Sequence, residues 1–241
     1  MKIAFFSDIH ANLPALEAFF KDTETEQVDA IYCLGDLVGY NVWPNEVVNE
    51  IRRRHIPTIM GNHDEALLKP IEHEEKPSNK GLTRALVSAA NRDYLINLPR
   101  HLKLSFNTQN KPFNLFITHG SVKAINDYMV VNYPEKDVLK MLHAQDADVL
   151  LCGHTHKPFH RVIKDKETFK HVINIGSVGK PKDGDSRICY AILELNQTTS
   201  PNSNALKVTF KRAEYDVEKA AKAVENSAFD SAYATALRLA K

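Results

Sequence analysis

Short runs of consecutive apolar residues recur along the first third of the chain, and each is followed by a polar cluster and then by a helical pattern. The runs are Ile3 to Phe6, Ala30 to Leu34 and Ile56 to Met60. Runs of this length are typical of strands buried on both faces, and their alternation with helices is typical of parallel βαβ units. The pattern predicts three parallel strands with their polar clusters at one sheet edge, where open α/β sheets bind ligands.

Apolar residues also recur at helical spacing in five segments. These segments begin after Asn12, after Pro44, near Leu82, near Val217 and near Tyr233. The stripe near Leu82 continues through Ala89 and predicts one helix, whereas residues 69–80 are polar, contain prolines and predict a loop. We expect a single domain over residues 1–241, with the helical segment 216–240 packed on it rather than on a partner.

The pattern changes after Leu102, where apolar and polar residues alternate. This alternation predicts an antiparallel hairpin formed by residues 102–106 and 113–117. A second hairpin is expected to join residues 159–163 to residues 169–173, and residues 206–210 are expected to form a strand with one solvated face. The chain therefore combines parallel and antiparallel strands.

Composition and charge limit the classes of protein to consider. With 241 residues, 43% hydrophobic and 25% charged, the chain has the composition of a soluble globular protein. A formal charge of +1 provides no strong field toward nucleic acid or an anionic membrane, so neither partner is expected. The apolar start is too short for a signal peptide, and no run reaches the ~18 residues of a membrane span. We expect a cytoplasmic protein.

The three cysteines show no CxxC spacing, which argues against a zinc finger, a redox site or a disulfide framework. Cys33, Cys152 and Cys189 each lie in an apolar run, so we expect three buried thiols.

Five polar clusters carry the candidate chemistry. Each follows an apolar run, and together they contain Asp8, His10, Asp36, Asn62, His63, Asp64, His119, His154 and His156. Carboxylates and neutral imidazoles suit manganese, iron, zinc, cobalt or nickel ions better than calcium. Seven of these residues, all except His63 and Asp64, are too many ligands for one tetrahedral ion. They suit two divalent metal ions that share one carboxylate.

Each cluster is a weak signal alone, but their joint occurrence in order at strand ends is specific. The sequence reads Asp8-Ile9-His10, Gly35-Asp36 with Tyr40, Gly61-Asn62-His63-Asp64, His119-Gly120 and Gly153-His154-Thr155-His156. In these motifs it resembles the calcineurin-like metallophosphoesterase superfamily, over residues 1 to about 195. The resemblance implies an α/β fold, namely a four-layer α/β/β/α sandwich with two mixed central sheets.

The same resemblance implies roles for the individual residues. Asp8, His10 and His156 would bind one metal ion, Asn62, His119 and His154 the other, and Asp36 both. A hydroxide that bridges the two ions would then attack a phosphomonoester or phosphodiester. His63 is the candidate general acid or phosphate ligand, and with Asp36 it makes up the catalytic prediction. Asp64 would either orient His63 or cap the following helix, and we favour the cap because Asp at a helix start needs no other explanation.

Within the superfamily, the chain resembles small single-domain bacterial and archaeal phosphoesterases. These share Gly-Asp-x-Val-Gly-Tyr and a later glycine-rich segment, which here spans residues 174–185 with Ile175 in place of the usual proline. Residues 176–180 look like a phosphate loop but lack its spacing, and Pro181 stands where Ser or Thr is required.

Residues around the clusters have weaker signals. Asn12 and Asn41 are candidate phosphate contacts, although Asn12 is also a good helix cap. Loop tyrosines and a tryptophan are candidates to stack a nucleobase or aromatic leaving group, with loop packing as the alternative. They are Tyr40, Trp43, Tyr128 and Tyr133. Lys180, Lys182 and Arg187 are candidate rim cations or solvated side chains. Surface or turn positions are expected for His55, His73, His101, His143, His160 and His171.

The sequence thus predicts a phosphoesterase with a small-molecule phosphate ester substrate. The alternative is a non-catalytic protein of the same fold that acts as an interaction scaffold, which the complete ligand set disfavours. A nuclease would need a basic groove. Substrate selectivity would reside in the loops at residues 37–45, 69–81, 121–134 and 176–186, whose sequences leave the substrate and the oligomeric state open.

Overall fold

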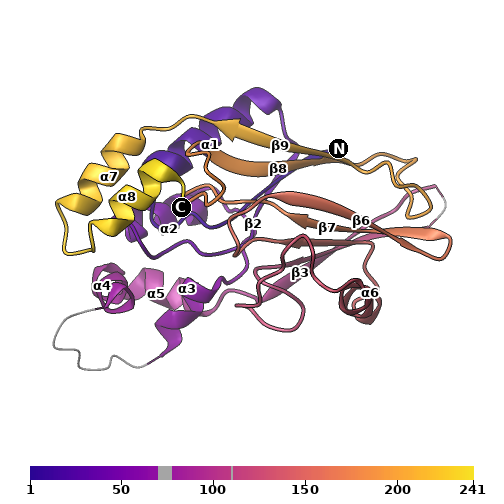
Figure 1. Ribbon diagram of the computed structural model, residues 1–241, viewed down its shortest axis with the longest axis horizontal. Helices are drawn as coiled ribbons and strands as arrows, with labels where there is room; N and C mark the ends of the chain where they lie inside the picture. Colours follow the sequence, from indigo (N-terminus) through magenta and orange to yellow (C-terminus); the bar gives the residue numbers. More distant parts are fainter. Residues whose placement is uncertain (70–77, 110) are drawn as a thin grey trace.

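The computed structural model describes residues 1–69, 78–109 and 111–241, and its strands form two sheets (Figure 1). Sheet A has the order β2-β1-β8-β9. Its strands are β1 (Lys2–Phe6), β2 (Ala30–Cys33), β8 (Ile188–Glu194) and β9 (Lys207–Ala213). Strands β1 and β2 are parallel, as the first two apolar runs predict, and β8 is antiparallel to both β1 and β9.

Sheet B has the order β3-β4-β5-β7-β6. Its strands are β3 (His101–Phe106), β4 (Phe113–Thr118), β5 (Val149–Cys152), β6 (Phe159–Asp165) and β7 (Thr168–Asn174). Both predicted hairpins are confirmed: β3 pairs antiparallel with β4, and β6 pairs antiparallel with β7. Parallel pairing of β5 with β4 and β7 makes this sheet mixed as well.

The inner faces of the two sheets bury each other. Ile3 and Phe5 from β1 share one core cluster with Leu115 from β4, Leu151 from β5 and Ile173 from β7. The alternate residues of these strands face outward, where helices cover them. Apolar burial between the sheets and beneath the helices produces the four-layer α/β/β/α sandwich, which confirms the predicted fold class.

Helices α1 (Leu13–Glu26), α2 (Pro44–Arg53) and α5 (Ala89–Ile96) cover the outer face of sheet A, and α6 (Glu135–Ala144) covers that of sheet B. Two short elements, α3 (Asn62–Glu65) and η1 (Ala66–Leu68), follow the third apolar run, and α4 (Asn79–Leu86) precedes α5. Helix α1 starts where expected, because the Asn12 side chain accepts a hydrogen bond from the Ala15 amide at 3.3 Å.

The C-terminal helices α7 (Val217–Glu225) and α8 (Ala232–Leu239) lie at one end of the sandwich, at the left of Figure 1. They pack on each other and on Val42 and Trp43, which follow β2.

Two predicted elements differ from the structure. Residues 56–60 form no regular strand but only one isolated parallel bridge, between Cys33 and Thr58. The Ile59 amide donates to Cys33 O at 3.0 Å, but Pro57 has no N–H to extend this ladder in one direction, and in the other the Gly61 amide donates to Asp64 Oδ2 at 2.9 Å instead. The single helix predicted from Leu82 through Ala89 is two helices, because Ser88 accepts a hydrogen bond from the Asn91 amide at 3.3 Å and caps α5.

Other expectations concern cysteines, membranes and the polar loop. The three cysteines are free and buried, as predicted. Among the helices of the described residues, none combines the length and apolar character needed to cross a bilayer. Most of the loop predicted at residues 69–80 lies outside the described residues.

Candidate metal centre

The polar clusters meet at the carboxyl ends of strands from both sheets. Sheet A supplies Asp8 and His10 after β1 and Asp36 after β2, and Asn62 follows the extended segment beside β2. Sheet B supplies the other three imidazoles, His119 after β4 and His154 and His156 after β5. The seven predicted ligands are therefore brought to one place by two sheets whose inner faces pack together.

The backbone at this edge is sharply turned. Five of the seven predicted ligands have positive φ angles between 51° and 63°, a left-handed conformation that is uncommon for residues other than glycine. They are Asp8, His10, Asp36, His154 and His156. Hydrogen bonds between loops hold this conformation: the Asp8 amide donates to Gly35 O at 3.0 Å, and the His10 amide donates to Asp36 O at 2.9 Å. Such strain is characteristic of functional sites.

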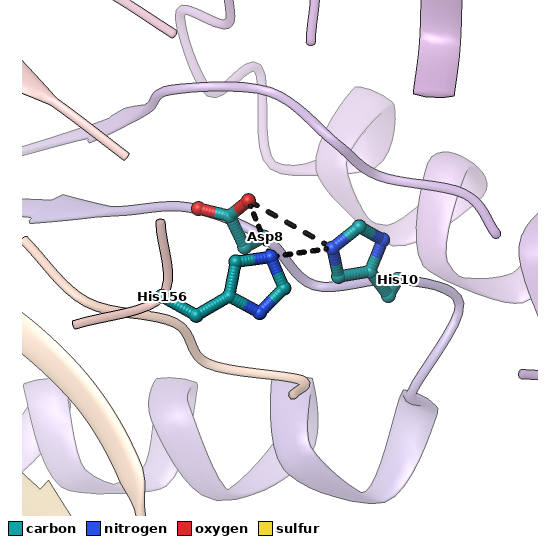
Figure 2. Close-up of side chains that lie close together, drawn as sticks. All are labelled: Asp8, His10 and His156. Carbon is teal, nitrogen blue, oxygen red and sulfur yellow. Dashed lines mark hydrogen bonds and ion pairs between the residues drawn. The ribbon is translucent and has the colours of Figure 1, made fainter. Parts of the chain in front are cut away.

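One donor cluster consists of Asp8, His10 and His156, all buried (Figure 2). Asp8 Oδ1 lies 3.2 Å from His156 Nε2 and 3.7 Å from His10 Nε2. The two imidazole nitrogens are themselves 3.2 Å apart. Three potential ligand atoms thus point toward one another from two loops.

A second cluster consists of Asp36, His119 and His154, also buried. Asp36 Oδ2 lies 3.3 Å from His119 Nε2 and 3.7 Å from His10 Nε2, so this carboxylate stands between the two clusters. The Asn62 side-chain oxygen lies 3.1 Å from His119 Nε2. This arrangement brings together the two ligand sets expected from the sequence.

Main-chain carbonyls orient three of the imidazoles. The acceptors are Val38 O for His10 Nδ1 at 3.0 Å, Leu34 O for His119 Nδ1 at 2.8 Å and Lys180 O for His156 Nδ1 at 2.5 Å. Because a carbonyl can only accept, each Nδ1 carries a proton, and Nε2 is the ring atom that faces the other potential ligands. Metal-binding histidines typically have this second hydrogen bond.

Two buried atoms at the centre, Asp8 Oδ1 and His154 Nε2, have no hydrogen-bond partner among the residues that the structure describes. Buried polar atoms are almost always paired, because an unpaired one costs its full desolvation energy. A cation bound between the clusters would satisfy both atoms. The donor set of carboxylate oxygens, imidazole nitrogens and one amide oxygen therefore fits divalent transition metals.

The charges at the centre also favour a bound cation. Burial alone raises the pKa of Asp36, but the neighbouring His119 and His63 imidazoles outweigh it, and the pKa lies well below its ordinary value. Burial lowers the pKa of His119, yet the nearby Asp36 and Asp8 carboxylates reverse this and raise it to about 10. The metal-free centre thus places a proton on His119 to balance two buried carboxylates. A cation would supply the same compensation.

His63 lies beside the two clusters. Its amide donates to Asp36 Oδ1 at 2.8 Å, and its ring is 4.9 Å from the His10 ring and 4.7 Å from the Tyr40 ring. The side chain is partly exposed, and among the described residues its ring nitrogens have no hydrogen-bond partner.

Asp64 accepts hydrogen bonds from three amides rather than orienting His63. The donors are Gly61 N at 2.9 Å, Asp36 N at 2.8 Å and Leu37 N at 3.0 Å. The first bond caps the start of α3, as expected from the sequence, whereas the other two tie that helix to the turn after β2. No sequence signal indicated this second role.

The predicted substrate contacts Asn12 and Asn41 are buried, with exposed fractions of 0% and 1%. Asn12 caps α1 and donates to Gly179 O at 2.8 Å, whereas Asn41 donates to His10 O at 2.8 Å. Their side chains support the loops at the centre and are not exposed to solvent.

Among the remaining histidines, the expected surface position is wrong for His171. This residue is in β7, is 0% exposed, and lies with its Nδ1 3.0 Å from His160 Nε2. Strand alternation explains the burial, because His171 shares the inner face of sheet B with Ile173. His55, His101 and His143 are exposed as expected, and His73 lies outside the described residues.

Comparison with known proteins identifies relatives that cover nearly the whole chain. The family model described as the calcineurin-like phosphoesterase superfamily domain matches residues 1–198. An uncharacterised protein of Methanocaldococcus jannaschii is 31% identical in an alignment 236 positions long that covers 90% of this chain and 89% of the relative.

Solved structures show the same fold. A metallophosphoesterase from Sphaerobacter thermophilus is 29% identical, with a TM-score of 0.78 and coverage of 100% of this chain and 99% of its own. A hypothetical protein from Pyrococcus horikoshii, 20% identical, has a TM-score of 0.79 over 98% of this chain and 97% of its own.

Proposed function

This chain belongs to the calcineurin-like phosphoesterase superfamily, and we propose that it hydrolyses phosphomonoesters or phosphodiesters with two divalent metal ions bound at the centre described above. The observation that carries the proposal is the pair of buried unpartnered atoms, Asp8 Oδ1 and His154 Nε2, within two adjoining donor clusters. Manganese, iron, zinc, nickel and cobalt all fit this donor set.

Each of the seven predicted ligands is assigned to one or both ions. Asp8, His10 and His156 would hold one ion, Asn62, His119 and His154 would hold the other, and Asp36, which stands between the two clusters, would serve both. Divalent ions, when bound, supply Lewis-acid stabilisation of charge on the phosphoryl group and lower the pKa of water. A neutral amide at Asn62, instead of a third carboxylate, keeps the loaded centre positive toward an anionic substrate.

His63 is the residue that we propose to contact the phosphoryl group or the leaving oxygen. No main-chain carbonyl of the described residues binds its ring nitrogens, unlike the Nδ1 atoms of His10, His119 and His156, and its ring is partly exposed beside Asp36. A neutral leaving alcohol requires a proton at the ester oxygen as the bond to phosphorus breaks, and the protonated His63 ring would supply it. Burial lowers the pKa of His63, which makes the protonated ring a stronger acid.

Hydrolysis of 4-nitrophenyl phosphate and bis(4-nitrophenyl) phosphate tests the proposal, with each of the five metals added in turn. We expect Asp36→Ala and His119→Ala to abolish activity and metal binding together. His63→Gln is expected to keep its metal and, on an alkyl phosphate ester whose leaving oxygen must be protonated, to lose roughly 10²- to 10⁴-fold in kcat, the usual contribution of a general acid; the loss on the 4-nitrophenyl esters should be smaller. His143→Ala is the matched control, because His143 is 54% exposed on α6.

Full activity in Asp36→Ala would contradict the site assignment. A purified protein that binds none of the five metals and cleaves neither ester would favour the alternative, a non-catalytic protein of this fold that acts by binding other proteins.

A further inference from the structure

An exposed tyrosine stands beside the metal centre. The Tyr128 ring lies 4.4 Å from the ring of His154 and is tilted by 49° to it, and the residue is 60% exposed. One side of the Tyr128 ring therefore packs against His154, a proposed metal ligand, while most of the surface of Tyr128 faces solvent. The neighbouring Val130 and Val131 are also exposed, at 42% and 56%.

The loop that carries Tyr128 is held on both sides of this residue. Asp127 Oδ2 accepts hydrogen bonds from Ser121 Oγ at 2.5 Å and from the Tyr133 hydroxyl at 2.9 Å. Met129, on the other side, is only 1% exposed and packs in the core under α6. Because both neighbours are fixed, the Tyr128 ring is presented in one place without a large loss of loop entropy on binding.

An arginine from sheet B holds the far end of the same loop. Arg161 Nη1 donates to Val131 O at 3.3 Å and to Tyr133 O at 2.5 Å. Side-chain hydrogen bonds within the loop and from Arg161 of β6 thus support the segment that carries Tyr128.

A second tyrosine borders the centre from the other sheet. The Tyr40 ring is 4.8 Å from the His10 ring, 4.7 Å from the His63 ring and 5.1 Å from the Tyr233 ring. Tyr40 is enclosed by these rings, whereas Tyr128 has most of its surface free. Of the two tyrosines, Tyr128 is therefore the one that can receive a ligand.

We propose that Tyr128 is a stacking platform for a flat, apolar group esterified to the substrate phosphate, an aryl ring or a nucleobase. The proposal rests on the proposed function, because it requires the phosphoryl group to bind at the metal centre. A rigid tyrosine ring offers a wide apolar face with a polar edge, and stacking on it favours planar groups over small alkyl groups. The platform would select substrates by the group attached to phosphate, while the metal ligands bind any phosphoryl group.

Non-hydrolysable phosphonates test the platform without the influence of leaving-group reactivity. Binding of phenylphosphonate and methylphosphonate to the manganese-loaded protein is measured by titration calorimetry and as competitive inhibition. We expect Tyr128→Ala to weaken phenylphosphonate binding about 5- to 10-fold and to change methylphosphonate binding less than about twofold. Tyr128→Phe keeps the ring and should bind both as the wild type does.

Val162→Ala is the control for loss of an exposed apolar side chain, since Val162 is 41% exposed on β6. A second pair of probes, the phosphonate analogues of uridine 5′-monophosphate and ribose 5-phosphate with CH₂ in place of the ester oxygen, identifies the source of the flat group. A Tyr128→Ala loss confined to phenylphosphonate supports an aryl ester, and one that extends to the nucleotide analogue but not to the ribose 5-phosphate analogue supports a nucleoside ester.

Equal weakening of phenylphosphonate and methylphosphonate in Tyr128→Ala would overturn the platform and show that Tyr128 only positions His154. Unchanged binding of both ring-containing probes would overturn it as well. If neither phosphonate binds the metal-loaded wild type, the proposed function fails first, and the platform fails with it.

Discussion

Three histidines at the metal centre are oriented by main-chain carbonyls, which cannot be recognised in the amino-acid sequence. The carbonyl acceptors belong to Leu34, Val38 and Lys180, whose side chains do not take part in these hydrogen bonds. Any residue type has such a carbonyl, so the motifs identify the imidazoles but not what holds them. The same limit applies to His171, whose burial follows from strand register rather than from a motif.

His171 leads to a prediction about stability and pH. Burial lowers the pKa of His171 from 6.5 to about 4, with smaller effects from the neighbouring His160, Asp148 and Lys170. Between pH 4 and 6.5 the unfolded chain binds a proton here that the folded protein does not, so the free energy of unfolding rises with pH in this window. The total rise from this group is about 3 kcal/mol, at 1.36 kcal/mol per pKa unit.

Urea unfolding at a series of pH values measures this slope. We expect His171→Phe to flatten it across the window, whereas His55→Phe, at an exposed position, should leave it unchanged. A wild-type slope that persists in His171→Phe would show that other groups cause it.

At the scale of elements, the turn after β2 and the start of α3 form one unit. The Asp64 carboxylate accepts hydrogen bonds from main-chain amides of the turn after β2 and of the start of α3. Gly39 allows the same turn to approach His63 closely. Gly39 has a φ of +97°, and a Cβ added there would lie 2.6 Å from His63 Nδ1. The glycine in the sequence Gly-Asp-x-Val-Gly-Tyr therefore permits both a left-handed turn and the close approach of a proposed catalytic ring.

Gly39→Ala separates these two roles when compared with Gly184→Ala. Gly184 also has a positive φ, +84°, but nothing lies within 4 Å of a Cβ built there. Both substitutions should cost about 1 kcal/mol of folding free energy from the left-handed backbone. Only Gly39→Ala should also lower turnover, roughly 10- to 100-fold, because it displaces the His63 ring.

Turnover of bis(4-nitrophenyl) phosphate, bound metal and chemical unfolding are measured for both variants. Equal loss of turnover in Gly184→Ala would mean that backbone strain, not contact with His63, causes the effect.

At the scale of the whole molecule, the two sheets meet at the metal centre. Asp8 and Asp36 come from sheet A, whereas His119, His154 and His156 come from sheet B, so a bound cation would connect the two halves of the sandwich. Apolar burial between the inner faces brings the halves together, and the same arrangement leaves two buried carboxylates in need of positive charge. Metal binding and global stability are therefore expected to be coupled.

Thermal unfolding with and without manganese measures this coupling. At a free metal concentration of 100 times Kd, binding adds about 2.7 kcal/mol to the free energy of unfolding, which for a chain of this size is roughly 5–10 °C in Tm. Asp36→Asn removes the shared carboxylate and should lose most of the shift. Glu24→Ala, at an exposed position on α1, should keep it. A full shift in Asp36→Asn would contradict a site shared between the sheets.

Much of this architecture could be predicted from the sequence. Alternation of apolar residues predicted both hairpins of sheet B, and helical spacing predicted α1, α2, α7 and α8, because these patterns depend on neighbours along the chain. The predictions of a strand at residues 56–60 and of a single helix through Ala89 were wrong because the apolar pattern does not report main-chain hydrogen bonding. A proline amide and a serine cap change the hydrogen bonding without changing the apolar pattern.

The side chains that make up the candidate centre are specified by the sequence itself, since strand ends followed by aspartate, asparagine and histidine are local features. Their positions in space depend on contacts between residues more than one hundred positions apart, such as His10 and His156, whose Nε2 atoms are 3.2 Å apart. The carbonyls that orient the imidazoles, the burial of Asn12 and the exposure of Tyr128 beside His154 likewise arise only when the sheets pack together. Apolar burial sets that arrangement, because it depends on whole faces of the sheets and not on any motif.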